Sequence, residues 1–506
     1  MISPMASRIW EAFQDVVAAG PDRVAIYGLS ESASATFAGL SSDAHALRIM
    51  LARHLPATPC LIAAVGNRTA FVPLLLAASA LGAATVLLDG GSLFADVAAV
   101  ADRLAADGIV LRVEMALAQG LPFEPLAAGL CLVRRVPTEA AQWRHDGREP
   151  CILKMTSGSG GRPRAVVATE SHLVEDARQI AEAMTITSAD VNLAVIPLAH
   201  SYAIGNLLMP LLLQGSPMAL RDRFAPREVA DDVRACGVTT FPGVPYIYEH
   251  LRRHGLAEAL RGLRLMITAG APVSHETVLF YQQATGRKIH SFYGTSETGG
   301  ISYDDTDEVG GYQTVGRPMP RTIVTLLPCA SASPGAGRVF VQGAAVAPGY
   351  AITEADDGPA AFVDGGFLTG DLGSSDDSGR LVLIGRVSSF INVAGRKVDP
   401  AEVEAVLRSA TSVLEARVIG LPCGTRGEQV VACIRPRHTG GVTAQLRAHC
   451  ARHLAAHKVP RQILVFEELP VDRRGKLDRV AIERLLGRST PTPYNALAVE
   501  ARTEDE

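Results

Sequence analysis

Residues 58–89 read TPCLIAAVG, NRTAFVPLLLAASALG and AATVLLD in succession. The first and third segments are short apolar runs typical of buried strands, and the middle one has the length of a helix that stops near Gly82. Because two strands joined by a helix lie parallel in one sheet, this stretch predicts a β–α–β unit. A membrane span over the uncharged residues 70–88 is the weaker alternative, since Pro73 and Gly82 interrupt it.

The same rhythm of strand-length and helix-length segments continues downstream and predicts an α/β fold with mixed, largely parallel sheets flanked by helices. Its later strands are VNLAVIPLAH (191–200), GVTTFPGV (237–244) and LRLMITAG (263–270). From about Gly335 the strands become shorter, with Gly and Asp between them, which we interpret as a small β-barrel-like part of the large domain. After Arg386 a smaller α+β pattern follows. We therefore predict a large N-terminal domain over residues 1–387, a small mobile C-terminal domain over 388–488, and a disordered tail over 489–506.

The composition is that of an ordinary folded protein of several units. The chain has 506 residues, of which 48% are hydrophobic and 20% charged, so a large core is available. The formal net charge of -4 provides no global attraction for nucleic acid or for anionic lipid. Any polyanion must therefore bind at a local site, and we expect no nucleic-acid partner.

Cysteine usage and the N-terminus indicate a cytoplasmic protein. The eight cysteines include no C-x-x-C pair, which argues against both a disulfide framework and a zinc knuckle. Charged residues in the first fifteen positions leave no apolar run for a signal peptide. Only five of the 48 basic residues are Lys, so a Lys in a motif that needs an ammonium is more informative here than in most chains.

The strongest local motif is CILKMTSGSGGRPRAVV at residues 151–167, an apolar strand that enters a turn rich in Gly and Ser. Small residues allow backbone N–H groups to approach phosphate oxygens, and Thr156, Ser157 and Ser159 add hydroxyl donors. The motif lacks the Gly-Lys-Ser/Thr of a Walker A loop, and Pro163 breaks the dinucleotide fingerprint. A polyphosphate site and a flexible loop are equally compatible with this stretch alone.

Three further segments carry polar residues in suggestive positions, although each is weak alone. HSFYGTSETGG (290–300) places an aromatic, hydroxyl residues and Glu297 in one turn after a strand, and GFLTGDLG (366–373) places Asp371 in a tight turn where it could accept hydrogen bonds from a ribose. LPVDRRGKLDR (469–479) presents Lys476 on a glycine-containing loop, where a solvated charge is the simplest interpretation.

Taken together and in this order, these segments resemble the adenylate-forming superfamily, which includes acyl-CoA synthetases, carrier-loading adenylation domains and luciferase-like ligases. The resemblance extends from about Thr36 to Leu486 and is closest to the acyl-CoA synthetase branch. It rests on the segments TFAGLSSDAHAL, LLAASALGAATVLLD, TSGSGGRPRA, PLAHSYAIG, AGAPV, YGTSETGG, GRVFVQG with PGY, GFLTGDLG, GRVSSFINVAGRKVDPAEVE and LPVDRRGKLDR.

The resemblance implies an acid–thiol ligase that uses ATP, Mg²⁺ and CoA. Such an enzyme activates a small carboxylic acid as acyl-AMP, releases pyrophosphate, and transfers the acyl group to a thiol. One alternative is a ligase that loads a separate acyl carrier protein. A second is a non-catalytic relative that binds an adenylate or acyl group, suggested by Gly160 and Arg164, where the family usually has a hydroxyl residue and Lys.

The resemblance also implies roles for individual residues. Thr156, Ser157 and Ser159 would hold the β- and γ-phosphates, Glu297 would hold Mg²⁺, and Lys476 would bridge the substrate carboxylate and the α-phosphate. Tyr293 would stack on the adenine, whereas Asp371 and Arg386 would hold the ribose. The full implied nucleotide site comprises Thr156, Ser157, Gly158, Ser159, Arg164, Gly270, Ala271, Pro272, Tyr293, Gly294, Thr295, Ser296, Asp371, Arg386 and Lys397.

For the acid and the thiol, the resemblance implies a pocket and a mobile loop. The acid pocket would comprise His200, Tyr202, Ala203, Gly270, Ala271, Gly299 and Gly300. His200 would lie beside the substrate carboxylate, with a packed core histidine as the equal alternative. No Asp lies in these segments to bind an α-amino group, so an apolar acyl or aryl acid is favoured. Ser388, Gly395 and Arg396 would form the hinge and the CoA passage.

Overall fold

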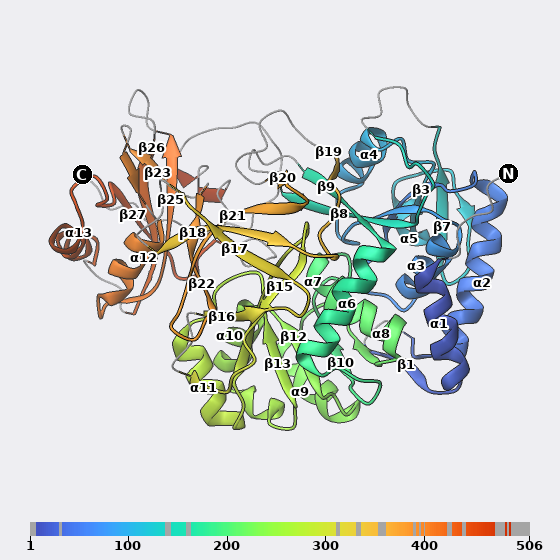
Figure 1. Ribbon diagram of the computed structural model, residues 1–506, viewed down its shortest axis with the longest axis horizontal. Helices are drawn as coiled ribbons and strands as arrows, with labels where there is room; N and C mark the ends of the chain where they lie inside the picture. Colours follow the sequence, from blue (N-terminus) through green and yellow to red (C-terminus); the bar gives the residue numbers. More distant parts are fainter. Residues whose placement is uncertain are drawn as a thin grey trace. The chain divides into compact units, whose positions relative to one another are not determined.

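The computed structural model describes residues 7–29, 33–136, 143–157, 163–309, 314–329, 335–352, 361–387, 391–393, 396–398, 400–422, 428–437, 442–470, 481–482 and 485–486. By the density of backbone contacts the chain divides into two compact units (Figure 1). The first comprises Met1–Leu327, Val339–Thr369 and Ser375–Val382, and the second comprises Pro328–Arg338, Gly370–Ser374 and Leu383–Glu506. The functional domain boundary between residues 387 and 388 stays a prediction.

An eight-stranded sheet in the first unit carries the β–α–β stretch that opens the sequence argument. Its order is β19-β9-β8-β4-β3-β5-β7-β6, and its four central strands β8, β4, β3 and β5 are parallel. The strands are β3 (Cys60–Ala64), β4 (Ala84–Leu87), β5 (Gly108–Arg112), β6 (Glu124–Pro125), β7 (Leu130–Arg134), β8 (Cys151–Ser157), β9 (Pro163–Thr169) and β19 (Tyr350–Ile352).

Residues 70–88 fold as predicted, as the helix α3 (Phe71–Ala80) followed by the buried strand β4. Gly82 has φ +72, a left-handed conformation that suits glycine, and it ends the helical segment. Among the described residues, no helix is both long and apolar enough to cross a bilayer.

A second sheet has fourteen strands, in the order β17-β18-β21-β22-β16-β15-β14-β13-β12-β10-β11-β1-β2, with β20 paired to β21. Strands β14, β13, β12, β10, β11 and β1 are parallel, and β15 and β16 add to them in antiparallel register. Its strands are β1 (Val24–Gly28), β2 (Ala35–Thr36), β10 (Asn192–Ala194), β11 (Met218–Leu220), β12 (Thr240–Gly243), β13 (Leu265–Thr268), β14 (Ile289–Thr295), β15 (Gly299–Tyr303), β16 (Thr314–Pro318), β17 (Ile323–Leu327), β18 (Ala336–Gln342), β20 (Ala361–Val363), β21 (Gly366–Ser375) and β22 (Leu381–Arg386).

This sheet corrects the prediction of a small β-barrel-like part, because the described strands form no closed barrel. Strand β16 pairs antiparallel with β15 on one side and with β22 on the other. The short Gly-rich strands after residue 335 therefore extend an open sheet instead of closing on themselves.

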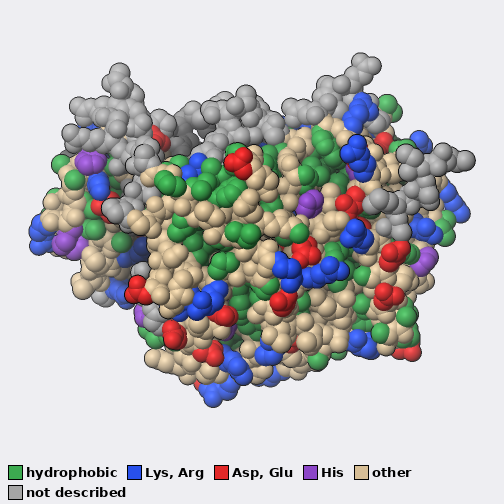
Figure 2. Space-filling view, in the orientation of Figure 1, with side chains coloured by type: hydrophobic (Ala, Val, Ile, Leu, Met, Phe, Trp, Pro, Cys, Tyr) green, Lys and Arg blue, Asp and Glu red, His purple; other side chains and the backbone are tan. Residues whose placement is uncertain are grey.

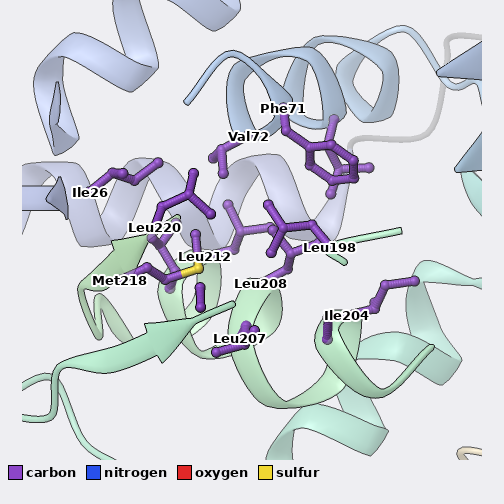
Figure 3. Packing of buried hydrophobic residues seen from close by; sticks show 14 of the residues in the cluster. Ile26, Phe71, Val72, Leu198, Ile204, Leu207, Leu208, Leu212, Met218 and Leu220 are labelled. Atoms are coloured by element: carbon purple, nitrogen blue, oxygen red, sulfur yellow. The ribbon is translucent and has the colours of Figure 1, made fainter. Parts of the chain in front are cut away.

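One hydrophobic core packs both sheets of the first unit together. It joins buried side chains of β3 in the first sheet to those of β11 in the second, with α3 and α8 between them. Figure 3 shows part of this packing, with Ile26, Phe71, Val72, Leu198, Ile204, Leu207, Leu208, Leu212, Met218 and Leu220. Helices α1, α2 and α3 contact one another beside this core (Figure 1).

The helices of the first unit are α1 (Arg8–Ala19), α2 (Phe37–His54), α3, α4 (Phe94–Arg103), α5 (Val113–Ala118), α6 (Glu170–Met184), α7 (Ser201–Ala203), α8 (Met209–Gln214), α9 (Pro226–Ala235), α10 (Pro245–Arg253) and α11 (His275–Thr285). A π-helix, η1 (Ile204–Leu208), joins α7 to α8, and a 3₁₀ helix, η2 (Ala257–Leu260), follows α10.

The second unit contains the predicted α+β pattern after residue 386. Strands β25 (Val413–Pro422), β26 (Glu428–Pro436) and β27 (Gln462–Val465) form one sheet, and β23 (Ile391–Val393) pairs with β24 (Arg396–Val398). Helices α12 (Pro400–Ser409) and α13 (Val442–His453) contact each other and complete a core of their own. The predicted tail 489–506 lies outside the described residues.

The seven cysteines that the structure describes are all free thiols. On the face that Figure 2 shows, Lys and Arg side chains are interspersed with Asp and Glu side chains. That face therefore carries no extended stripe of positive charge.

Candidate active site

In the chain, the glycine-rich residues 158–162 lie between the strands β8 and β9 of the first unit. Strand β8 pairs antiparallel with β9, and Thr156 lies opposite Arg164. The Thr156 hydroxyl oxygen is buried and has no hydrogen-bond partner among the described residues. A buried hydroxyl without a partner is costly, so this position suits a ligand that accepts or donates a hydrogen bond there.

The segment 290–300 is arranged differently from the single turn expected. Strand β14 extends through Tyr293, Gly294 and Thr295, so only residues 296–298 turn before β15 begins at Gly299. The pairing of β14 with β15 continues to the very end of β14, which keeps these residues in the sheet. A side chain on Gly294 would collide with the Gly299 carbonyl oxygen, so this tight turn requires glycine.

Glu297 is the carboxylate of this turn, and other segments fix its position. Its side chain is 6% exposed and accepts a hydrogen bond of 2.9 Å from the Tyr350 hydroxyl at the start of β19. The Arg164 guanidinium lies 4.9 Å from the centre of the Tyr350 ring. A cation over an aromatic face is attracted to it, so Arg164, Tyr350 and Glu297 form one connected group.

Helix α6 holds the end of the turn through Asp176. The Asp176 side chain is buried and accepts hydrogen bonds from the Gly300 N–H at 2.8 Å and from the Gln179 amide at 3.3 Å. Gln179 also donates to the Gly300 carbonyl oxygen at 3.0 Å. Gly299 has φ +67, and a side chain there would collide with the Asp176 carboxyl group. Burial raises the pKa of Asp176, whereas Lys154 and the Gly300 N–H lower it.

The predicted acid-pocket segment lies against the same turn. The Ser201 and Ser296 hydroxyl oxygens are 2.7 Å apart, and the Tyr202 ring stacks on Phe292 with centroids 5.8 Å apart. Tyr202 donates to the Ile267 carbonyl oxygen at 3.3 Å, and burial raises the pKa of its phenol well above the usual value. Ala203 is fully buried. His200 is half-buried and precedes α7 as its N-cap residue.

The loop that begins at Gly270 follows the end of β13, the parallel neighbour of β14. Because parallel strands end at the same sheet edge, Gly270, Ala271 and Pro272 leave the sheet on the edge that also carries residues 296–298. Gly270 is exposed with φ +83, and Ala271 is half-buried.

Asp371 and Arg386 belong to the second unit and form an ion pair there. The Arg386 Nε and Asp371 Oδ1 atoms are 2.8 Å apart, so the structure brings together the two predicted ribose ligands. The expected tight turn at Asp371 is wrong, because this residue lies inside the ten-residue strand β21. Gly370 and Gly373, on either side of Asp371, also lie within β21. This strand is hydrogen-bonded to β18 on one side and to β22 on the other.

Several predicted site residues lie outside the described part of the chain. These are Gly158, Ser159, Gly160, Ser388, Gly395 and Lys476. Ser157, Arg396 and Lys397 lie in β8 and β24, and only their backbone positions are described.

The described residues suit a magnesium ion that is bound mainly by phosphates. Among them, no group of three or more His, Cys, Asp and Glu side chains could hold a metal ion. Mg²⁺ at a nucleotide is commonly held by one or two carboxylates together with phosphate oxygens and water. Glu297 offers one buried carboxylate of this kind, near the end of the hairpin strand that carries the orphan Thr156 hydroxyl.

A family model described as AMP-binding enzyme matches residues 13–351, and a second, described as AMP-binding enzyme C-terminal domain, matches residues 402–476. The chain belongs to the AMP-binding enzyme family. The site elements of the first unit, from β8 to the beginning of β19, fall within the first match.

Similar proteins from this family include a probable CoA ligase of Humulus lupulus, 29% identical over 67% of this chain and 66% of that protein. A 2-succinylbenzoate–CoA ligase of Geobacillus kaustophilus is 31% identical over 69% of this chain and 71% of its own length. The matched stretch thus spans just under two thirds of the first of these proteins. The crystal structure of ATP-bound MatB from Rhodopseudomonas palustris shares the fold, with a TM-score of 0.81 at 20% identity over 95% of this chain and 99% of that one.

Sequence reasoning about this member of the AMP-binding enzyme family missed three residues that hold the site together. Tyr350 was quoted only as part of a motif, although it donates to Glu297. Asp176 was missed because it lies in an amphipathic helix, 121 residues before Glu297, although the charges of both carboxylates act on Lys154. Lys154 could have been found, since a Lys inside an apolar strand is conspicuous in a chain with five Lys.

Proposed function

We propose that the chain is an ATP- and Mg²⁺-dependent carboxylic acid:CoA ligase. The observation that carries this proposal is the turn 296–300, which joins the candidate metal ligand Glu297 to the candidate acid-binding segment through the contact of Ser296 with Ser201. The two similar proteins described above are named as CoA ligases, and this supports the thiol as acyl acceptor.

In the first half-reaction the substrate carboxylate oxygen attacks the α-phosphorus of ATP. The new bond is the acyl–phosphate bond, and the bond from the α-phosphorus to pyrophosphate breaks. Thr156, Ser157 and Ser159 hold the departing phosphates, and Tyr350 keeps the Glu297 carboxylate in place. Glu297 would hold Mg²⁺, which would supply positive charge to these phosphates. The protein thus contributes position and charge compensation.

In the second half-reaction the thiol sulfur attacks the acyl carbon, AMP leaves, and the thiol proton is lost. We assign this step to a rearranged small domain over residues 388–488, with Lys476 serving the first step and Gly395 the second. Ser388 is the hinge, Arg396 belongs to the CoA passage, and Lys397 belongs to the nucleotide site. Support comes from the separate family match at 402–476 and from the separate core of the second unit.

We further propose that Tyr293 stacks on the adenine and that the Asp371–Arg386 pair binds the ribose. An Asp carboxylate accepts hydrogen bonds from vicinal hydroxyls, and its 2.8 Å contact with Arg386 orients it. The Arg386 side chain is 55% exposed.

The acid substrate is an apolar acyl or aryl acid. The described segments of the candidate acid pocket carry aromatic and aliphatic side chains, among them Tyr202, Phe292 and Ala203, which favours an apolar substrate. The carboxyl group of Asp176, which lies against this turn, already accepts a hydrogen bond from the Gly300 N–H. An α-ammonium group in this pocket would be buried without its own partner, which costs several kcal/mol.

The experiment that tests the function is acid-dependent exchange of labelled pyrophosphate into ATP over fatty, aryl, dicarboxylic and amino acids. Reactions with CoA and with a holo-carrier protein are then analysed by mass spectrometry. We expect exchange with an apolar acid and an acyl-CoA product. Absence of exchange with every acid would refute the ligase, and acylation of the carrier alone would refute CoA as acceptor.

We place this activity in the cytoplasm. The seven described cysteines are free thiols, which a reducing compartment preserves. Fractionation of cells that produce the tagged protein tests this, with recovery in the membrane or exported fraction as the contrary result.

A further inference from the structure

Two lysines of the first unit are buried, and they differ in how their ammonium groups are satisfied. Lys288 is 1% exposed. Its ammonium donates to the carbonyl oxygens of Thr306 at 3.0 Å and Glu308 at 2.9 Å, and lies 2.6 Å from an Asp304 carboxyl oxygen. An ammonium has three N–H donors, so Lys288 is fully paired within the protein.

Lys154 is 5% exposed, yet within the described ranges its ammonium has neither a hydrogen bond nor an ion pair. Burial lowers the pKa of Lys154, whereas the charges of Asp176 and Glu297 raise it. The two carboxylates therefore lie close enough to interact electrostatically with the ammonium, but they accept no hydrogen bond from it. A buried ammonium with no hydrogen bonds is costly, and an anionic ligand would remove that cost.

Strand geometry places Lys154 with the orphan hydroxyl. Side chains two residues apart lie on one face of a strand, so Lys154 and Thr156 of β8 share a face. Ile152, two residues earlier, belongs to the hydrophobic core that packs the two sheets together. Leu153, on the opposite face of β8, belongs to a separate hydrophobic cluster. The buried Lys154 side chain and the buried, unpartnered Thr156 hydroxyl oxygen thus follow each other on one face of the strand that leads into the glycine-rich loop.

We propose that Lys154 is a phosphate-binding residue, whose ammonium binds the phosphate chain of the nucleotide together with the Thr156 hydroxyl. The identity of the ligand as ATP rests on the proposed function. The ammonium supplies a donor to a phosphate site whose loop has Gly160 where a hydroxyl residue is usual. A compact ammonium also fits a buried position that the wide guanidinium of Arg does not, which accounts for a Lys in so Arg-rich a chain.

The first test compares Lys154→Met with the matched variant Lys288→Met, using calorimetric titration with pyrophosphate, ATP and adenosine. Met keeps the length of the side chain and removes its charge. We expect Lys154→Met to weaken pyrophosphate and ATP binding about tenfold or more, the loss of one hydrogen bond to a charged group, and to leave adenosine binding within about twofold. We expect Lys288→Met to lower thermal stability without changing the ratio of pyrophosphate to adenosine affinity.

Unchanged pyrophosphate binding by Lys154→Met, or equal losses for pyrophosphate and adenosine, would overturn the proposal. The second outcome would make Lys154 a structural counter-ion of Asp176 and Glu297. A parent protein that binds ATP and pyrophosphate but forms no thioester would contradict the ligase function and leave Lys154 as a phosphate ligand. A parent that binds neither would contradict both.

A second measurement uses the unmodified protein and stays decisive if Lys154→Met does not fold. The chain contains only five lysines, so lysine labelled with ¹³C at Cε gives five side-chain signals. Variants of Lys288, Lys397, Lys458 and Lys476 assign four of them, and Lys154 follows by elimination. We expect pyrophosphate to shift the Lys154 signal and to leave that of Lys288 in place. A Lys154 signal that pyrophosphate at saturation leaves unmoved would overturn the assignment.

Discussion

Gly299→Ala should disable the active-site turn through a collision with Asp176. At φ +67 an alanine is strained by about 1–2 kcal/mol. Its side chain would also overlap the Asp176 carboxyl group, which would have to release the Gly300 N–H that it now accepts at 2.8 Å. A hydrogen bond to a charged group contributes about 1.5–3 kcal/mol. The strain acts mainly on folding, whereas the lost hydrogen bond acts on the position of Glu297.

We therefore expect kcat/KM for acid-dependent pyrophosphate exchange to fall about 10- to 150-fold in Gly299→Ala. The matched control is Gly286→Ala at the end of α11. Gly286 has φ +75, and a side chain there would meet no described atom within 4 Å. This control should lower the melting temperature through strain alone and leave the exchange rate at the parent value.

A double-mutant cycle separates the collision from other effects of the alanine. In an Asp176→Ala background the obstructing carboxyl group is absent, so Gly299→Ala should add little further loss of exchange activity. Parent-like activity of the single variant would refute the reasoning. So would an effect of Gly299→Ala that is undiminished in the Asp176→Ala background, because the carboxyl group would then not transmit it.

Three other outcomes are expected. Tyr350→Phe removes the hydroxyl that holds the candidate metal ligand and should raise the Mg²⁺ concentration for half-maximal exchange about 10- to 100-fold; an unchanged requirement would contradict this. Lys476→Ala should slow acyl-AMP formation ~10²–10³-fold but leave conversion of supplied acyl-AMP and CoA near the parent rate, with Gly395→Leu doing the reverse; equal losses in both steps would exclude these roles. Burial raises the pKa of Asp190, but hydrogen bonds from Arg264 and from neighbouring residues lower it by more, so the pKa in the folded protein is below the usual value. Ionised Asp190 therefore stabilises the fold above about pH 4, and this stabilisation is lost as the pH falls through the pKa of the folded state. Asp190→Asn should therefore flatten the acid side of a melting-temperature profile, and an unaltered profile would show that this pair is not responsible.

The elements that the sequence predicts well are those fixed by local pattern. Residues 71–80 and 84–87 form the helix and strand expected, because an uninterrupted apolar segment with a glycine break has few alternatives inside a core. The pattern around Asp371 is equally clear as a turn signal, yet the residue lies within β21. Glycine allows a turn without requiring one, and neighbouring strands on both sides supply the hydrogen bonds that keep β21 extended. The conformation at Asp371 is therefore determined by the pairing of β21 with the strands β18 and β22, and not by the local sequence pattern.

The candidate site shows the same division between local and distant causes. The sequence motifs select Thr156 and Glu297 as candidate phosphate and metal ligands, because the chemistry of phosphate and metal binding favours certain residue types at short spacing. The groups that set the charge and position of these residues come from separate segments: Asp176 from α6, Tyr350 from β19, and Lys154 from the interior of β8. Asp176 and Tyr350 have no distinguishing pattern in the sequence, and Lys154 is conspicuous only as a Lys inside an apolar strand. A buried charge needs a partner or a ligand, and for this reason we propose Lys154 as a ligand-binding residue of the site.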